Sequence, residues 1–398
     1  MTCIRQARCA AAKAAFAACA LALAPGARAE EPIKIGILVT TTGPYAPWGR
    51  EYQEAIGLYL DQHNGKDGNP TVEVLYRDVG GDNPPRAHQL AQDLVIRDHV
   101  AVLGGLEFTT TVLSVADVIS QARMPFVIFN SASDFVVDKS PYYLRPTFTS
   151  WETGYIGAKW EAEQGMKRAT IVAADYAPGQ DTIDVYTKGL ADSGGKVIDV
   201  IKVPMGTTDF STYFQRISDN KPDVLDVFMP GGPMSIGMAR GFAERGWGKE
   251  GIGYMGGGVF ERDMGSIGDI LIGQYGVSNY APALENPTNK AFMAAFTKRN
   301  NGDLPDFAAV AAYDGMNLIF HMLKAAPDHD GDKMLAAAKG FAWDSPRGPM
   351  RIDPKTRETV QNIYITKVEK VDGRLMNVPF RTYPDVVDPW HETHPPTQ

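Results

Sequence analysis

The fold of this chain is decided by the stretch from residue 33 to residue 65, IKIGILVTTTGPYAPWGREYQEAIGLYLDQHNG. It predicts a buried strand over Ile33–Val39, then a loop, then a helix over Glu51–His63, whose apolar residues recur at helical spacing. Asn64 and Gly65 mark the end of that helix. A strand that is apolar throughout and leads into such a helix is typical of a parallel βα unit.

The same alternation continues along the chain in two series. In the first series we expect strands over Thr71–Tyr76, Ala101–Gly104 and Pro125–Phe129, with helices over Pro84–His99 and Thr109–Ala122. In the second series we expect strands over Ala169–Ala174, Lys196–Val203 and Val224–Met229, with helices over Trp151–Gln164, Asp181–Asp192, Asp209–Asp219 and Met234–Arg245. Two series of βα units predict two α/β lobes, each with a parallel sheet covered on both faces.

The last third of the chain has a different pattern. Helices are predicted over Pro287–Arg299, Phe307–Ala326 and Lys333–Lys339, and we expect them to pack on the first lobe. Strands over Met350–Asp353 and Val360–Lys370, with a turn at Asp372-Gly373, are expected to join the second lobe. The tail after Pro384 is polar and rich in proline, and we expect it to be loosely held.

The first 29 residues have the layout of a secretory signal peptide. A basic leader precedes an apolar run over residues 14–24, and Ala27-Arg28-Ala29 forms an A-x-A cleavage site. We therefore expect export to the periplasm. All the cysteines, Cys3, Cys9 and Cys19, precede this site, so a mature protein would have neither a disulfide nor a reactive thiol. Cys19 lies in a near match to a lipoprotein box, which leaves lipidation open as an alternative.

Composition and motifs argue against several function classes. The net charge is −8, with no basic cluster, which disfavours nucleic acid as a partner. The sequence holds no G-x-S-x-G, P-loop or H-E-x-x-H motif, and Gly256-Gly257-Gly258 is interpreted as a tight turn. The histidines are scattered, and His391 and His394 have the wrong spacing for a zinc site. We therefore expect no enzyme activity, no cofactor and no metal.

A ligand site is expected where the strands of the two lobes end, because open α/β sheets bind ligands beyond the carboxyl ends of their strands. The loops at these ends are rich in aromatic and hydroxyl side chains. Candidates from this reasoning are Tyr45, Trp48, Phe108, Thr109, Ser133 and Tyr176. Core packing remains an alternative for the aromatic residues, and helix capping remains one for the hydroxyl residues.

Several short motifs, taken in order, carry a resemblance to a known family. They are Thr42-Gly43-Pro44 with Trp48-Gly49, Gly104 with Thr109-Thr110, Pro125 with Ser131-Ala132-Ser133, Thr208-Asp209-Phe210-Ser211, Ala312-Tyr313-Asp314 and Gly348–Asp353. Over residues 32–380 the chain resembles the Leu/Ile/Val-binding family of bacterial periplasmic solute-binding proteins, which serve ABC importers.

The resemblance implies a type I periplasmic binding protein. In this fold, two Rossmann-like lobes with parallel sheets are joined by three crossovers, expected near Thr149, Tyr280 and Ser345, and they close on the ligand by a hinge. The implied organisation is a signal peptide over 1–29, a first lobe over 30–149 plus 281–345, and a second lobe over 150–280 plus 346–398. The implied partners are a small carboxylate and the membrane permease, with the binding protein itself a monomer.

The resemblance also implies roles for individual residues. Trp48 matches a residue that walls the pocket, while Thr109 and Ser133 match residues that bind the ligand carboxylate. Ala132 matches a residue that offers its carbonyl, and Tyr313 matches a tyrosine at the cleft.

The departures from the family pattern bear on the ligand. Amino-acid binders hold the ligand ammonium with a glutamate, and the local match here is Gly257-Gly258. The residue beside the carboxylate site is Phe108, and an unpaired ammonium would be costly to bury. We therefore expect a carboxylate without an α-amino group, and favour an aromatic acid. Alternatives are an amino acid, urea or amide held by Glu107 or Glu261, and a ligand-sensing module that signals to a protein partner.

Overall fold

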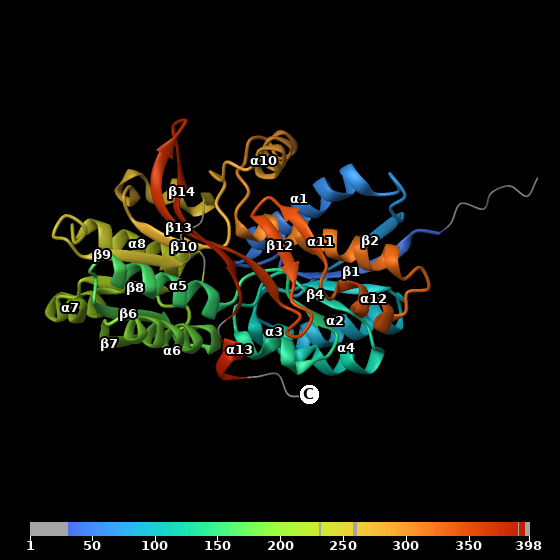
Figure 1. The fold of residues 1–398 in the computed structure, drawn as a ribbon, viewed down its shortest axis with the longest axis horizontal. Coiled ribbons are helices and arrows are strands. Elements are labelled where there is room, and N and C mark those ends of the chain that lie inside the picture. Colours follow the sequence, from blue (N-terminus) through green and yellow to red (C-terminus); the bar gives the residue numbers. More distant parts are fainter. Residues whose placement is uncertain (1–30, 231, 258–260, 389, 395–398) are drawn as a thin grey trace, which may run out of the picture. The chain divides into compact units, whose positions relative to one another are not determined.

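The computed structural model describes residues 31–230, 232–257, 261–388 and 390–394. The predicted signal peptide and Gly258 lie outside the described residues. The described residues from Ile33 onward form one compact unit (Figure 1). Among the described residues, no helix combines the length and the apolar character needed to cross a membrane.

The first lobe is built on a five-stranded sheet in the order β2-β1-β3-β4-β5. Its strands are β1 (Ile33–Val39), β2 (Val72–Asp78), β3 (Val102–Gly105), β4 (Phe126–Ile128) and β5 (Tyr143–Leu144). All of the pairings between neighbours in this sheet are parallel. The predicted strand Ile33–Val39 is confirmed residue for residue, and its last five residues are buried.

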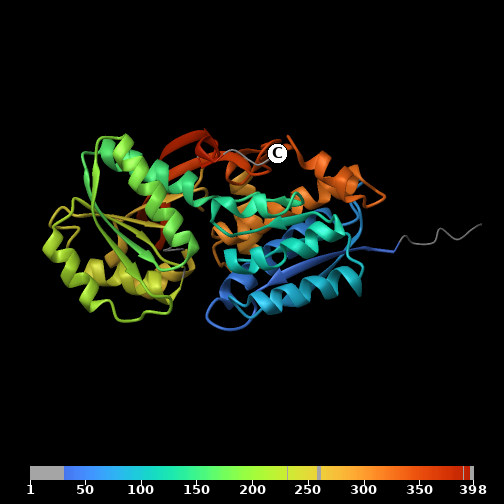
Figure 2. The same cartoon turned by 90° about the horizontal axis from the view of Figure 1, so that it is seen from below.

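Helices cover this sheet on both faces (Figure 2). They are α1 (Ala46–His63), α2 (Pro84–Ile96), α3 (Thr109–Ser114), α4 (Ala116–Ala122), the 3₁₀ helix η1 (Asp134–Lys139), α10 (Pro287–Arg299), α11 (Phe307–Ala325) and α12 (Gly331–Ala338). Helix α1 begins five residues earlier than predicted, because Pro47 is tolerated in its first turn. Helix α11 packs against α1, so this helix of the last third lies with the first lobe.

The second lobe is built on a nine-stranded sheet in the order β11-β12-β13-β10-β9-β8-β6-β7, with β14 paired to β13. Its strands are β6 (Arg168–Ala174), β7 (Lys196–Val203), β8 (Val224–Phe228), β9 (Gly253–Gly257), β10 (Tyr275–Ser278), β11 (Ala342–Ser345), β12 (Gly348–Ile352), β13 (Thr359–Val371) and β14 (Arg374–Val386). The strands from β7 to β10 are parallel, and β13 joins β10 in the antiparallel sense. The βα part of this sheet is therefore parallel, as predicted, and the C-terminal strands add antiparallel pairs to it.

The helices that follow the crossover from β5 belong to the second lobe. They are α5 (Ser150–Glu163), α6 (Ala177–Asp192), α7 (Ser211–Asn220), α8 (Pro233–Glu244), α9 (Glu261–Ile267) and the 3₁₀ helix η2 (Asp269–Leu271), whereas α13 (Trp390–Thr393) lies in the tail. Thr149 caps α5 through a capping box with Glu152, so the helix begins at a fixed residue directly after the crossover.

Part of the described tail is held against the rest of the chain, so the expectation that it is loosely held is wrong for Asp388 and His391. Strand β14 continues to Val386, and Asp388 is 3% exposed. His391 Nε2 lies 2.7 Å from Glu358 Oε2, so a side chain of the tail reaches a buried carboxylate. The polar composition of the tail reflects these buried contacts.

Buried ion pairs tie the segments that pass between the lobes. Asp314, on α11, accepts hydrogen bonds from Arg347 Nη2 at 2.6 Å and from Ser345 Oγ at 2.7 Å. Arg347 also donates to the carbonyl oxygen of Pro146 at 2.7 Å. Both charged groups are 1% exposed, so the crossover near Ser345 is anchored to a first-lobe helix.

Candidate ligand-binding site

A cavity of about 120 Å³ lies at the carboxyl ends of strands from both sheets. Its lining includes residues that follow β3, β4, β6, β8 and β10, which is where the sequence predicted a site. The volume is of the same order as the roughly 150 Å³ apolar cavity that accepts one benzene ring. The cavity therefore has the scale of a single-ring solute.

Most of the predicted residues meet at this cavity. Trp48, Phe108, Thr109, Ala132 and Tyr176 all line it. The rings of Trp48 and Phe108 stack with centroids 5.9 Å apart and planes at 23°. Across the cavity, Tyr176 stacks on Phe228 with centroids 6.2 Å apart. Aromatic walls thus come from both lobes.

Two predicted residues lie beside the cavity and are not among its described lining. Tyr45 packs edge-on against Phe108, with centroids 4.9 Å apart, and so supports the aromatic wall from behind. Ser133 is fully buried, and its Oγ has no hydrogen-bond partner among the described residues.

Tyr313 lies elsewhere, and the expectation that it lies at the cleft is corrected. Its hydroxyl donates to Gln62 Oε1 at 2.6 Å, and its ring packs against Tyr59 and Phe292, at the contact of α11 with α1 and α10. Its neighbour Asp314 performs the structural role described above. Gly257 ends β9, and the residues directly after it lie outside the described part of the chain.

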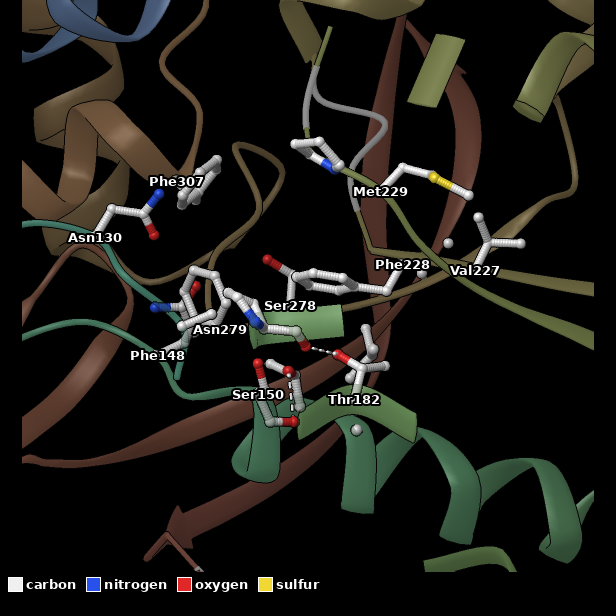
Figure 3. Close-up of a pocket in the computed structure, with 18 of the residues that line it drawn as sticks. Asn130, Phe148, Ser150, Thr182, Val227, Phe228, Met229, Ser278, Asn279 and Phe307 are labelled. Carbon is white, nitrogen blue, oxygen red and sulfur yellow. Dashed lines mark hydrogen bonds between the residues drawn. The ribbon is translucent and has the colours of Figure 1, made fainter. Parts of the chain in front are cut away.

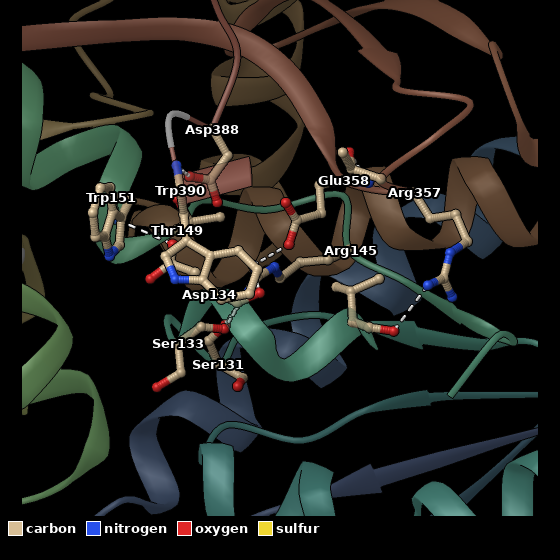
Figure 4. Close-up of polar contacts among 12 residues, drawn as sticks. Ser131, Ser133, Asp134, Arg145, Thr149, Trp151, Arg357, Glu358, Asp388 and Trp390 are labelled. Atoms are coloured by element: carbon tan, nitrogen blue, oxygen red, sulfur yellow. Dashed lines mark hydrogen bonds and ion pairs between the residues drawn. The ribbon is translucent and has the colours of Figure 1, made fainter. Parts of the chain in front are cut away.

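The loop after β4 is fixed by Arg145 from behind (Figure 4). Arg145 Nη1 donates to the carbonyl oxygens of Ser131 and Ser133, at 2.8 and 2.6 Å. Its Nη2 pairs with Glu358, and both side chains are buried. Arg145 is not among the described lining residues. Its ion pair with Glu358 therefore has a structural role.

This anchoring orients the peptide groups of the loop. In a trans peptide the N–H points opposite to the carbonyl, so the N–H of Ala132 points away from Arg145. The carbonyl oxygen of Ala132 accepts a hydrogen bond from the N–H of Ser150 at 2.8 Å. The resemblance assigned this carbonyl to the ligand, but it already has a partner within the chain. The N–H of Ser133 consequently points away from Ser150.

Glu107 and Glu261, the two acids considered as alternative partners for a ligand ammonium, differ in their position relative to the cavity. Glu107 lines the cavity, but its oxygens accept the N–H and the hydroxyl of Thr40, both at 2.9 Å. Burial raises the pKa of Glu107 to about 7, although those hydrogen bonds act to lower it. Glu261 accepts the N–H of Asn377 at 3.0 Å, and it is not part of the described lining.

Sequence reasoning missed several lining residues, among them Phe148, Ser150, Thr182 and Phe307 (Figure 3). Thr182 Oγ1 donates to the carbonyl oxygen of Pro178 at 2.9 Å, whereas Ser150 Oγ has no partner among the described residues. Phe307 comes from the last third of the chain, and no local pattern could place it here. Asp226 was also missed, although a lone acid within the apolar strand Val224–Phe228 was a visible signal.

The described lining contains no lysine, arginine or histidine. Its carboxyl groups are Glu107 and Asp226, and burial raises the pKa of both, to about 7 and about 8. The site therefore presents hydroxyl groups, peptide N–H groups and aromatic faces, with little fixed charge.

One group of side chains has the composition of a metal site. Possible ligand atoms of Glu358, Asp388 and His391 all lie within 4.8 Å of one another. Glu358 already pairs with Arg145 and with His391, whereas Asp388 Oδ2 and His391 Nδ1 have no hydrogen-bond partner among the described residues.

Two α/β lobes with a solute-sized cavity at their strand ends define a solute-binding protein of the periplasmic class. The chain belongs to the periplasmic binding protein family, whose model matches residues 32–374. It is 35% identical over 373 residues to the Leu/Ile/Val-binding protein homolog 6 of Brucella melitensis, covering 92% of this chain and 95% of that relative.

Solved structures show the same fold. A solute-binding protein of an ABC transporter from Rhodopseudomonas palustris BisB5, in complex with 3,4-dihydroxybenzoic acid, has a TM-score of 0.86 and 38% identity, covering 91% of this chain and 99% of that one. A solute-binding protein from Rhodopseudomonas palustris HaA2, in complex with p-hydroxybenzoic acid, has a TM-score of 0.87 and 37% identity, covering 90% and 98%.

Proposed function

We propose that this protein captures an aromatic carboxylic acid without an α-amino group and delivers it to the membrane permease of an ABC importer. Hinged closure of the two lobes would bury the ligand without any covalent step. Export to the periplasm by the signal peptide over 1–29, and action as a monomer, belong to the same proposal.

The observation that carries the proposal is that the described lining residues offer no ready counter-charge for an ammonium. Both oxygens of Glu107 are used by Thr40, and burial favours the neutral form of Asp226 at pH 7. Leaving an ammonium unpaired in a closed cavity would cost several kcal/mol, because the desolvation of its charge is not repaid. A carboxylate without an amine avoids this cost.

The carboxylate of the ligand would bind at the first lobe. Thr109 and Ala132 line the cavity there, and the N–H of Ala132 points away from Arg145. The hydroxyl of Thr109 lies 3.1 Å from that of Ser131, which leaves its orientation free to adapt to an acceptor. The ring would lie between the aromatic walls of Trp48 with Phe108 and of Tyr176 with Phe228.

The comparisons support this ligand class. The two Rhodopseudomonas palustris proteins that match over nine tenths of this chain are described with hydroxylated benzoic acids bound. The relatedness to Leu/Ile/Val-binding protein homologs, at 35% identity, favours a branched-chain amino acid as the second candidate.

A thermal-shift screen tests the proposal. The chain without residues 1–29 would be heated with a panel of benzoates and phenylpropanoids, and with a panel of amino acids and amides. A ligand at 100 times its Kd stabilises the folded state by about 2.7 kcal/mol, which raises the midpoint by several degrees. We expect a rise with aromatic acids alone. A rise with amino acids alone would contradict the proposal and favour the second candidate.

A further inference from the structure

A carboxyl group is embedded in the second-lobe wall of the cavity. Asp226, on β8, lines the cavity and is only 7% exposed. The next residues of the chain that line this wall are Val227, Phe228 and Met229, all of them apolar (Figure 3). It is the one carboxyl group that the second lobe gives to the described lining. A buried acid in such a wall costs free energy of folding, which points to a role in binding.

A second buried acid, Glu161, lies close enough to Asp226 for their charges to interact. Glu161, on α5, is fully buried, and the charge of Asp226 adds to burial in raising the pKa of Glu161 well above its ordinary value. Neither acid forms an ion pair with a basic group in the described part of the chain. Two like charges in a buried site cannot both persist, so at least one of the two acids holds a proton at neutral pH. Burial raises the pKa of Asp226 to about 8, which favours its neutral carboxylic acid form at the cavity at pH 7.

The hydrogen-bonding capacity of this acid pair is not used. Asp226 Oδ2 and both carboxyl oxygens of Glu161 are buried without a hydrogen-bond partner among the described residues. A buried polar group left without a partner costs free energy, so a ligand that supplies a partner gains affinity. A neutral carboxylic acid offers one O–H donor and one carbonyl acceptor, which is the complement of a hydroxyl group.

Asp226 is positioned to contact one edge of the aromatic ring of a bound ligand. Thr109 and Ala132 line the cavity from the first lobe, whereas Asp226 lines it from the second. A ligand whose carboxylate lies at Thr109 and whose ring lies between the aromatic walls would direct its far edge toward the second lobe. We propose that Asp226 is a specificity-determining residue that recognises a hydroxyl group on the ring of the aromatic acid. This inference rests on the proposed function and narrows its ligand class to ring-hydroxylated acids.

Calorimetric titration of benzoate, 3-hydroxybenzoate and 4-hydroxybenzoate tests the inference. We expect at least one hydroxybenzoate to bind the unmodified protein at least 10-fold more tightly than benzoate does. Asp226→Val should remove this preference, so that benzoate and the hydroxybenzoates bind this variant with Kd values within about 3-fold of one another. Asp226→Asn should retain much of the preference, because an amide also offers a donor and an acceptor.

Thr170→Val is the matched control. Thr170 is a fully buried residue of the same sheet whose Oγ1 also lacks a partner among the described residues, but it is not in the described lining. The ratio of the two dissociation constants should not change in this variant. If Asp226→Val fails to fold, Asp226→Ala takes its place and should give the same loss.

The outcomes separate this inference from the proposed function. Equal binding of benzoate and the hydroxybenzoates to the unmodified protein, or a preference that survives Asp226→Val, would overturn the inference and leave aromatic acids as the ligand class. Binding of amino acids with no binding of any aromatic acid would overturn the proposed function, and the inference with it.

Discussion

Arg145 and Ser133 are joined by a hydrogen bond of 2.6 Å, from the guanidinium Nη1 to a main-chain carbonyl oxygen. The arginine is fully buried, and it holds the loop after β4 from the side opposite to the N–H of Ala132. A positive charge thus organises the candidate carboxylate site through the backbone, although it is not among the described lining residues.

Replacing Arg145 should damage both stability and binding. In Arg145→Met, Glu358 loses its cationic partner inside the protein, and breaking a buried pair in this way costs about 3–5 kcal/mol. The loosened loop should also weaken aromatic-acid binding by about 10-fold or more. Urea unfolding and calorimetric titration measure the two effects.

Arg97→Met is the control for this experiment, because the side chain of Arg97 is 76% exposed and its pair with Asp93 contributes little. A loss of stability below about 1 kcal/mol in Arg145→Met would contradict the role assigned to the arginine.

Trp48→Leu should weaken the binding of aromatic acids by about 5- to 30-fold. The change removes one face of the first-lobe wall, and aromatic pairs contribute about 0.5–1.5 kcal/mol beyond the area that they bury. Trp247→Leu is the matched control. Trp247 is 6% exposed and packs against Phe214 and Phe242 in the second-lobe core, away from the described lining. Unchanged affinity in Trp48→Leu, measured by titration, would remove this residue from the site.

Tyr313→Phe should leave the affinity for the ligand unchanged. The hydroxyl of Tyr313 donates to Gln62, so its removal affects only the contact between α11 and α1. We expect a loss of stability of about 1 kcal/mol at most, because the bond is exposed to solvent. A change of more than 3-fold in Kd would return Tyr313 to the site.

His391→Gln should reduce stability more at pH 6 than at pH 9. Burial acts to lower the pKa of His391, but the hydrogen bond to Glu358 and the negative charges of Glu358 and Asp388 outweigh it, so the pKa is raised. A raised pKa stabilises the fold below the unfolded value of about 6.5, and this contribution disappears as the pH rises through the folded value.

The difference in unfolding free energy between the unmodified protein and His391→Gln, measured across this range, tests the sign. Glu358 stays charged throughout, because Arg145 and His391 together outweigh burial and lower its pKa. A difference that grows toward pH 9 would contradict the assignment.

The sequence predicted the elements that local patterns control. Apolar periodicity located Ile33–Val39 and the repeated βα units, and strand ends located Trp48, Phe108, Thr109 and Tyr176 at the cavity. These predictions succeeded because residues directly after parallel strands converge at one edge of a sheet.

Contacts between distant segments could not be predicted in the same way. Phe307 reaches the cavity from α11, and His391 reaches Glu358 from the tail, and neither placement has a local signal. Tyr313 was misplaced because a motif identifies a helix without giving the direction of each side chain. Asp226 was overlooked because the sequence analysis interpreted its strand only by the apolar residues around it, although the strand also gives this acid to the described lining.

The central claim is that the cavity takes aromatic acids that lack an α-amino group. Its most direct test is a calorimetric titration with two pairs, phenylacetate with phenylglycine and 3-phenylpropanoate with phenylalanine, because the members of each pair differ only in the ammonium group. We predict that the acid without the amine binds at least 100-fold more tightly in any pair that binds. Equal or tighter binding of the amino acid would contradict the claim.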